Sequence, residues 1–399
     1  MTPEERAALR FDSKTVYYPE DDATQSIAAP LVMSSSFQYD AEIYQRVVEG
    51  ERKDVNIYGR CGNPTEYQFE EQMMQIESAD ACLATASGMA AISVVLFGLL
   101  KSGDHIVCDW TTYSSTHEML DHRLTDFGIT TTFVDTADIE SVKAAIQENT
   151  RLIYFESIAN PTMKVADMAA LVEAAQHHEI LTVCDNTFAS PCVIRPLDWG
   201  VDLVVESATK FISGHSDVIG GAICMKSKVL PADFLEQIRW DTMVKWGSPL
   251  APFNAWLLLR SLQTLSIRVE RQCQSAMKLA NHFAQHEKVN RVWYPGLASH
   301  AQHALAKMQM PTFGGMLSFD VGNADKALKV LDGLRLACFA ASLGGVRTTT
   351  QIPASMAFLD IPEDERRQMG ISDGMIRVSV GIEDIDDLIE DFDRALALV

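Results

Sequence analysis

The sequence predicts an α/β fold, with a mostly parallel sheet covered by helices on both faces and a smaller α+β domain after it. Between residues 56 and 245, short apolar runs alternate with amphipathic stretches. A succession of strand, helix and strand implies parallel strands joined by right-handed crossovers. The short runs are apolar throughout, as expected for strands of a sheet that is covered on both faces. After about residue 246 the alternation ends, which predicts a second domain.

The strands expected in the first domain are short runs rich in branched apolar residues. Amphipathic helices are expected between them at 138–149 and 167–179, and Ile139, Val142 and Ile146 recur at helical spacing in the first. The expected strands are 105–109, 130–134, 151–156, 181–185, 202–206 and 220–225.

The second domain begins with a long helical pattern and ends with a helix whose first turn is acidic, which suits the helix dipole. The change in pattern places the boundary near residue 245, so the predicted domains are 56–245, which carries the ligand site, and 246–399. The elements expected in the second domain are helices at 252–286, near 324–334 and from 383 onward, and strands at 315–319 and 376–380.

Residues 1–55 are predicted to form an irregular arm. Pro3, Pro19 and Pro30 interrupt any long helix, and the run Ser34–Ser36 adds a further break. An arm of this kind rarely packs stably alone, so we expect it to contact a partner subunit. The alternative is a loose tail folded on its own chain.

The charge of the chain limits its partners. The formal net charge is −21, which repels nucleic acid and anionic lipid and excludes both as expected partners. The longest apolar run, 92–100, is far shorter than the ~20 residues of a membrane-spanning helix. The first residues do not resemble a signal peptide. The eight cysteines include no Cys-x-x-Cys pair, so we predict reduced thiols, a cytoplasmic setting and no metal site.

Polar residues follow several of the expected parallel strands, at the edge where α/β sheets bind ligands. Asp185 closes one strand, Tyr113 follows another, and Ser207, Thr209 and Lys210 follow a third. Taken alone, Asp185 could be a loop cap, Tyr113 a packed core residue and Lys210 a solvated surface lysine. Their joint placement at one edge of one sheet favours a site.

A phosphate site is expected beside them. Ser87, Gly88 and Met89 open a helix at 90–100, and free N–H groups at such a helix start bind anions. The hydroxyls of Ser207 and Thr209 would add two donors. The alternative for residues 87–89 alone is an ordinary helix start.

A phosphate site, a lysine, a carboxylate and an aromatic ring together match the requirements of pyridoxal 5′-phosphate (PLP). The lysine must form an imine with the cofactor, for which its pKa must fall. The carboxylate must pair with the pyridine nitrogen, because the protonated ring is the electron sink. We therefore predict that Lys210 holds PLP, that Asp185 pairs with its ring nitrogen and that Tyr113 stacks on its ring.

The run 202–216, DLVVESATKFISGHS, resembles the PLP-lysine signature of the Cys/Met-metabolism enzymes. These are cystathionine γ-synthases, cystathionine β- and γ-lyases and methionine γ-lyases. The resemblance implies an aspartate-aminotransferase-like fold with a seven-stranded sheet, and it covers nearly the whole chain. Further motifs that match the family are 58–65, 86–92, 156–162, 185–191, 342–345, 353–356 and 374–381.

The resemblance also implies a role for each matching residue. Tyr58 and Arg60 would reach the phosphate of a neighbouring subunit's cofactor, so the chain would form a homo-oligomer, usually a tetramer built as a dimer of dimers. Arg377 would clamp the substrate carboxylate as a fork, which lysine could not reproduce, with Ser342 beside it. Asn160 would lie near both the cofactor's phenolic oxygen and the substrate carboxylate. The phosphate site would comprise Gly88, Met89, Ser207 and Thr209, with Tyr58 and Arg60 added by the partner.

The implied reactions start alike, with Lys210 removing the proton on the substrate Cα. Loss of a β-substituent then gives pyruvate. Loss of a γ-substituent gives 2-oxobutanoate and ammonia, and a γ-synthase adds a thiol instead. The leading prediction is a PLP-dependent γ-lyase acting on methionine, homocysteine, an O-substituted homoserine or canavanine. The alternatives are a γ-replacement synthase that uses an O-acylhomoserine and a thiol, a cystathionine β- or γ-lyase, and a non-catalytic PLP-binding or carrier protein.

Two departures from the family patterns bear on the substrate. Methionine γ-lyases carry a cysteine two places after the stacking tyrosine, where this chain has Ser115. Cystathionine enzymes often carry glutamate where this chain has Arg347, which would repel the distal ammonium of cystathionine or the guanidinium of canavanine. Arg347 could instead turn outward or pair with an acid. We expect Ser115, Arg347 and the segment with Lys245 and Trp246 to form a specialised side-chain pocket.

Overall fold

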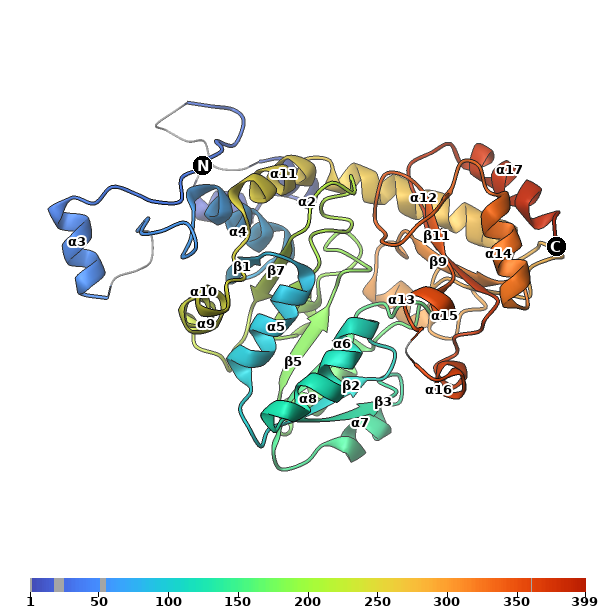
Figure 1. Ribbon diagram of the computed structural model, residues 1–399, viewed down its shortest axis with the longest axis horizontal. Coiled ribbons are helices and arrows are strands. Elements are labelled where there is room, and N and C mark those ends of the chain that lie inside the picture. The colour runs from blue at the N-terminus through green and yellow to red at the C-terminus, as the bar shows by residue number, and fades with distance from the viewer. Residues whose placement is uncertain (1, 18–24, 51–54, 360) are drawn as a thin grey trace.

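The computed structural model describes residues 2–17, 25–50, 55–359 and 361–399. Its larger sheet has the predicted seven strands, and their order is β1-β7-β6-β5-β4-β2-β3 (Figure 1). Strand β7 runs antiparallel to its neighbours β1 and β6, whereas the other neighbouring pairs are parallel. The strands are β1 Ala81–Thr85, β2 His105–Asp109, β3 Thr130–Val134, β4 Thr150–Glu156, β5 Leu181–Asp185, β6 Leu203–Glu206 and β7 Gly221–Met225.

Helices cover both faces of this sheet because alternate strand residues point to opposite sides. In β4, Leu152 and Tyr154 join one buried apolar cluster, while Ile153 and Phe155 join another. Helices packed on the first side include α5 Gly88–Leu99 and α9 Phe234–Ile238. Those on the second side include α4 Pro64–Glu77, α7 Ile139–Ala145, α8 Met168–Gln176 and α11 Pro252–Leu262.

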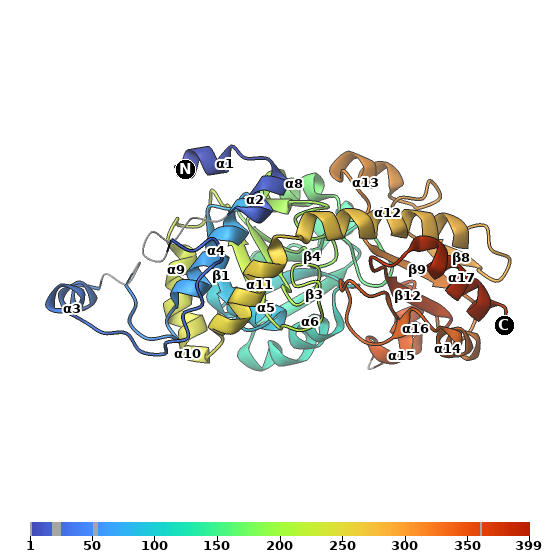
Figure 2. The same ribbon diagram turned by 90° about the horizontal axis from the view of Figure 1, so that it is seen from above.

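The smaller sheet has five strands in the order β10-β11-β12-β9-β8 and is mostly antiparallel. A third apolar cluster packs against it, and the long helix α12 (Leu265–Phe283) runs from the larger sheet toward it (Figure 2). The boundary near residue 245 stays a prediction. The other elements here are β8 Arg291–Trp293, α13 His303–Gln309, β9 Met316–Asp320, α14 Ala324–Gly333, β10 Cys338–Phe339, β11 Thr349–Gln351, α15 Pro353–Met356, α16 Glu363–Gln368, β12 Met375–Ser379 and α17 Ile385–Leu396.

In place of the single helix expected over 252–286 there are two helices, because the helical hydrogen bonding is interrupted between α11 and α12. The carbonyl of Ser261 accepts hydrogen bonds from the hydroxyl of Thr264 at 3.2 Å and from the guanidinium of Arg268 at 3.0 Å. Side chains therefore take over the carbonyl that the next helical turn would have used.

The prediction of an irregular arm over 1–55 is wrong in part, because the described residues form α1 Pro3–Ala7, α2 Phe11–Val16 and α3 Ala41–Val48. Pro3 stands at the first position of α1, where its missing N–H costs nothing. Asp40 caps α3, which lies away from the rest of the molecule (Figures 1 and 2) and has no buried residue. Pro19 lies outside the described residues, and contact with a partner stays a prediction.

Across the four described ranges, no helix combines the length and apolar character needed to cross a membrane. The carboxyl ends of the central parallel strands share one edge of the larger sheet. Strand register places Glu156 beside Asp185, and Asp185 beside Val205. This edge faces the smaller domain and defines where a site can form.

Candidate active site

A cavity of about 1020 Å³ lies at this edge, between the two sheets. It is large enough for a cofactor and a small substrate together. Most of the predicted site residues line it, coming from both domains. They are Gly88, Met89, Tyr113, Ser115, Asn160, Asp185, Ser207, Thr209, Lys210, Ser342 and Arg377.

Lys210 follows β6, and its amine donates a hydrogen bond to Oγ of Ser342 at 2.9 Å. Burial, and to a smaller extent the charge of Arg377, lower the pKa of Lys210 to about 8. About a tenth of the amine is therefore uncharged at pH 7, far more than for an ordinary lysine. An uncharged lysine amine can attack an aldehyde or accept a proton.

Asp185 is the last residue of β5. Its Oδ1 accepts the N–H of Thr187 at 3.0 Å, and its Oδ2 lies 3.4 Å from the hydroxyl of Tyr154. Burial raises the pKa of Asp185, and the hydrogen bonds from Thr187 and Tyr154 partly oppose that rise. The carboxyl is thus fixed in direction at the cavity wall, where it can pair with a protonated ring nitrogen.

The start of α5 forms the opposite end of the cavity. Ser87 caps the helix by accepting the N–H of Ala90 at 3.0 Å. A Cβ on Gly88 would lie only 2.7 Å from Cβ of Ser207, so a side chain there would separate the helix start from residues 207–209. Thr209 is held by Gly220, whose N–H donates to its hydroxyl oxygen at 3.1 Å. The close approach of a helix N-terminus and two hydroxyl residues suits a phosphate group.

Arg377 enters the cavity from β12 of the smaller sheet. Its Nη1 donates to Oδ1 of Asn160 at 3.0 Å, and its Nη2 donates to the carbonyl of Ser342 at 2.9 Å. Burial lowers the pKa of Arg377 to about 9, so the group is still a cation at neutral pH. A buried cation oriented by two acceptors can bind a carboxylate in a defined position.

Ser342 connects the two cations. Its hydroxyl accepts from Lys210 and its carbonyl accepts from Arg377. Its φ of 81° lies in the left-handed region, which a non-glycine residue adopts only when its surroundings require it. The strained backbone directs both oxygens of one residue toward the cavity.

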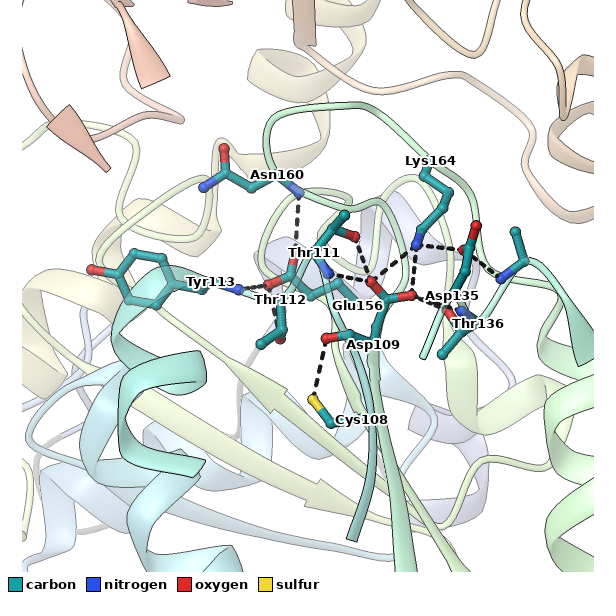
Figure 3. Close-up of polar contacts among 11 residues, drawn as sticks. Cys108, Asp109, Thr111, Thr112, Tyr113, Asp135, Thr136, Glu156, Asn160 and Lys164 are labelled. Carbon is teal, nitrogen blue, oxygen red and sulfur yellow. Dashed lines mark hydrogen bonds and ion pairs between the residues drawn. The ribbon is translucent and has the colours of Figure 1, made fainter. Parts of the chain in front are cut away.

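Glu156, the last residue of β4, lines the cavity but was absent from the predicted site. Its Oε1 accepts the N–H of Tyr113 at 2.6 Å and its Oε2 accepts the N–H of Asn160 at 3.0 Å (Figure 3). Burial, followed by the charge of Asp185, raises the pKa of Glu156 well above its usual range. An acid at the end of an apolar strand is the signal that could have identified it.

Four predicted residues do not line the cavity of this chain. Tyr58 is exposed, and the guanidinium of Arg60 donates to the carbonyl of Val244 at 2.6 Å. Their assignment to a partner's cofactor stays a prediction. Arg347 is also exposed, and Lys245 is an exposed residue paired with Asp241 at 2.9 Å, so the predicted specificity pocket is not formed by these residues within the described chain.

The site residues fit PLP. The close contact between Gly88 and Ser207 leaves a helix start open for its phosphate, the oriented carboxyl of Asp185 suits its ring nitrogen, and the amine of Lys210 suits its aldehyde. Bound there, the cofactor would supply an electron sink next to the substrate Cα. Among the described residues, no group of three or more His, Cys, Asp or Glu side chains could hold a metal ion.

Comparison with known proteins agrees with this geometry. The profile of the family "Cys/Met metabolism PLP-dependent enzyme" matches residues 13–397. An L-methionine γ-lyase of Fusobacterium nucleatum subsp. polymorphum is 41% identical over 374 residues, which is 93% of each chain. A cystathionine γ-lyase of Bacillus subtilis is 39% identical over 94% of this chain and 96% of its own. A crystal structure of a cystathionine γ-lyase from Lactobacillus plantarum complexed with L-serine superimposes with a TM-score of 0.89 at 37% identity, covering 98% of this chain and 99% of that one.

Proposed function

Because the chain belongs to the Cys/Met metabolism family of PLP-dependent enzymes, we propose that it is a γ-lyase, which eliminates the γ-substituent of an amino acid. The observation that carries the proposal is the contact from Lys210 through Ser342 to Arg377. It places a lysine amine with a lowered pKa next to a cation that can hold a substrate carboxylate. The family's cofactor, PLP, supplies the electron sink.

In the proposed reaction, Arg377 and Asn160 bind the substrate, while Lys210 and Tyr113 transfer protons. Arg377 and Asn160 hold the substrate carboxylate, which points the Cα–H bond toward Lys210. Lys210 removes the proton from Cα, gives it up again to the conjugated system of the bound substrate, and only then, as an uncharged amine, accepts a proton from Cβ. Tyr113, whose ring lies at the cavity wall, protonates the leaving group at Cγ. The products are the released γ-group and, after hydrolysis, 2-oxobutanoate and ammonia.

Elimination at Cγ is supported by relatives named L-methionine γ-lyase, at 41% identity, and cystathionine γ-lyase, at 39%, while a relative named cystathionine β-lyase also matches at 39%. Elimination at Cβ needs only one proton transfer and uses the same residues. A γ-replacement synthase uses the same residues again and adds a thiol. All three reactions therefore use the same residues at the centre of the cavity. They differ in which substrate bond breaks and in whether a thiol is added.

The outer part of the cavity bears on the side chain of the substrate. Its lining includes the exposed carboxylates Glu118, Asp121 and Glu365, which favour a substrate with a distal cation. Ser115 also lines the cavity, at the position where methionine γ-lyases carry cysteine. These features support testing canavanine, whose leaving group would be hydroxyguanidine, and cystathionine beside methionine, homocysteine and O-acylhomoserine.

The deciding experiment is a substrate panel with the PLP-loaded protein. Formation of 2-oxobutanoate from a γ-substituted amino acid is expected, in the absence of any added thiol. Pyruvate as the sole oxo acid would refute γ-elimination in favour of a β-lyase. A thioether formed only when a thiol is present would favour the synthase. Bound PLP without turnover of any compound would favour a carrier or binding protein.

We also propose that the protein acts as a homo-oligomer, as a dimer or as a tetramer of two dimers. Tyr58 and Arg60 lie next to each other, with the guanidinium carbon 5.7 Å from the ring centre, and neither lines the cavity of its own chain. Both are therefore available to complete the phosphate site of a neighbouring subunit. Light scattering measures the size of the assembly directly.

A further inference from the structure

Two loops at the edge of the larger sheet each deliver one active-site residue. The loop after β2, residues 109–113, delivers Tyr113. The loop after β4, residues 156–164, delivers Asn160. Figure 3 shows that the two loops are joined at two separate places by contacts of buried acidic side chains.

The first connection is the carboxylate of Glu156, which is 7% exposed. One of its oxygens accepts the N–H of Tyr113 at 2.6 Å, and the other accepts the N–H of Asn160 at 3.0 Å. Each oxygen accepts a hydrogen bond from a different loop. The distance between the two oxygens therefore sets how far apart the two backbone nitrogens lie.

The second connection is the ion pair between Lys164 and Asp109, whose nearest atoms are 2.7 Å apart. Asp109, which is 2% exposed, also accepts the N–H of Thr111 at 2.7 Å and the hydroxyls of Thr111 and Thr136. Burial alone would raise the pKa of Asp109, but the charge of Lys164 and these hydrogen bonds lower it below its usual value. Asp109 therefore stays ionised at neutral pH, and its contact with Lys164 holds the base of the first loop.

Lys164 belongs to the same turn as Asn160. Its carbonyl accepts the N–H of Ala159 at 2.8 Å, which closes the turn around Asn160. Its amine also pairs with Asp135 at 2.8 Å. Both ends of the second loop are thus attached to the first loop or to its immediate neighbours, and Asn160 in turn holds Arg377.

We propose that Glu156 and the Lys164–Asp109 pair are positioning residues, which fix the distance between Tyr113 and Asn160. This distance decides whether the group that covers the cofactor ring and the group that orients the substrate carboxylate are correctly placed at the same time. The inference rests on the proposed function only in assigning the ring and the carboxylate to those two places. Neither connection depends on which leaving group the substrate carries.

The variant Glu156→Gln tests the first connection with almost no change in shape. Two N–H donors face the two oxygens, and glutamine offers one oxygen and one NH₂ group. One donor must therefore lose its acceptor and face another donor, which releases one loop. Lys164→Met tests the second connection by removing its charge.

Asp391 provides a matched control. It is 2% exposed and accepts the N–H groups of Arg335, Leu336 and Ala337 at 2.9 to 3.3 Å. It lies on α17 of the smaller domain and does not line the cavity. Asp391→Asn therefore removes a buried carboxylate that anchors backbone N–H groups, without touching either loop.

The experiment uses the full-length protein loaded with PLP and two readouts that need no turnover. The circular dichroism of the bound cofactor in the visible region reports how its ring is held. The dissociation constant of free glycine, from the absorbance change on binding, reports how an amino-acid carboxylate is held. Glu156→Gln should reduce the visible circular dichroism and weaken glycine binding about tenfold, the loss expected for one hydrogen bond.

Lys164→Met should change both readouts in the same direction. The double variant should lose less than the product of the two single effects, because both connections act on one distance. Asp391→Asn should lower the melting temperature and leave both readouts unchanged. Proper folding of each variant is checked by its far-ultraviolet circular dichroism.

The proposal is overturned if Glu156→Gln lowers only the melting temperature, as the control does. It is also overturned if just one of the two readouts changes, because the loops would then be independent. Pyruvate as the sole product of the wild-type protein would refute γ-elimination but leave both readouts intact. Failure of the two proposals is thus distinguishable.

Discussion

Replacing Arg377 by lysine is expected to impair substrate binding while the protein keeps its fold. Arg377 uses two separate nitrogens to reach Asn160 at 3.0 Å and Ser342 at 2.9 Å. These contacts orient the guanidinium plane toward the cavity. A lysine ammonium keeps the charge but has neither the plane nor the fork, so it can satisfy at most one of these acceptors while facing a carboxylate.

The size of the effect follows from the contacts. One hydrogen bond made by a charged donor contributes about 1.5–3 kcal/mol. Loss of one such bond from the bound carboxylate therefore weakens binding about 10- to 150-fold, since 1.4 kcal/mol corresponds to a factor of ten. The effect should appear in KM and in the dissociation constant of free glycine. The catalytic rate constant at saturating substrate should change less, because the hydrogen bond from Lys210 to Ser342 does not use Arg377 itself.

The assay compares Arg377→Lys with Arg239→Lys. Arg239 is also a buried arginine, 4% exposed, but it pairs with Glu66, Glu70 and Glu236 and does not line the cavity. Both variants should lose stability, and Arg377→Lys alone should raise KM. A KM within threefold of the wild-type value for Arg377→Lys would refute the assignment of Arg377 to the carboxylate.

Three further predictions concern Lys210 and Arg60. Because burial and Arg377 lower the pKa of Lys210 to about 8, the rate at which the cofactor-free protein takes up PLP should rise with pH through about 8, as the amine loses its proton, and a rate independent of pH between 6 and 9 would contradict this. Between pH 8 and 10 the amine of Lys210 keeps its proton in the unfolded chain but loses it in the folded one. The free energy of unfolding of the cofactor-free protein should therefore rise over this range, and Lys210→Met should remove that rise. If Arg60 completes the partner's site, mixing inactive Arg60→Ala and Lys210→Ala subunits should restore part of the activity, since each mixed dimer contains one site with both residues intact. Once subunit exchange has been demonstrated, a failure to recover activity would refute the shared site.

Much of the larger sheet could be predicted from the sequence, because most of its strands are short apolar runs and four of the seven end in an acid. The strands expected at 105–109, 130–134 and 181–185 are β2, β3 and β5 without any shift. Strand β1 was not expected, since Ala81–Thr85 combines small residues with few branched ones and reads as part of the helix start that follows. The antiparallel direction of β7 depends on its pairing with β1 and β6, which no local pattern encodes.

The site could be predicted where one residue type is required at one strand end. Lys210 and Asp185 are of this kind. Glu156 was missed because its function depends on which backbone N–H groups a different loop presents to it. Ser342 was expected only as a substrate neighbour, since its contact with Lys210 joins residues 132 positions apart. Such contacts arise from packing the two domains together.

These contacts form one continuous path across the domain boundary. It runs from the amine of Lys210 to Ser342, from Ser342 to Arg377, and from Arg377 to Asn160. Glu156 then links the backbone of Asn160 to that of Tyr113. Since the path leaves the larger domain at Lys210 and returns to it at Asn160, any shift of β12 relative to the larger sheet changes the carboxylate site and the surroundings of the base together. Binding of a substrate carboxylate to Arg377 is therefore coupled to the position of the group that removes the Cα proton, and a substrate that lacks the carboxylate should lose turnover as well as affinity.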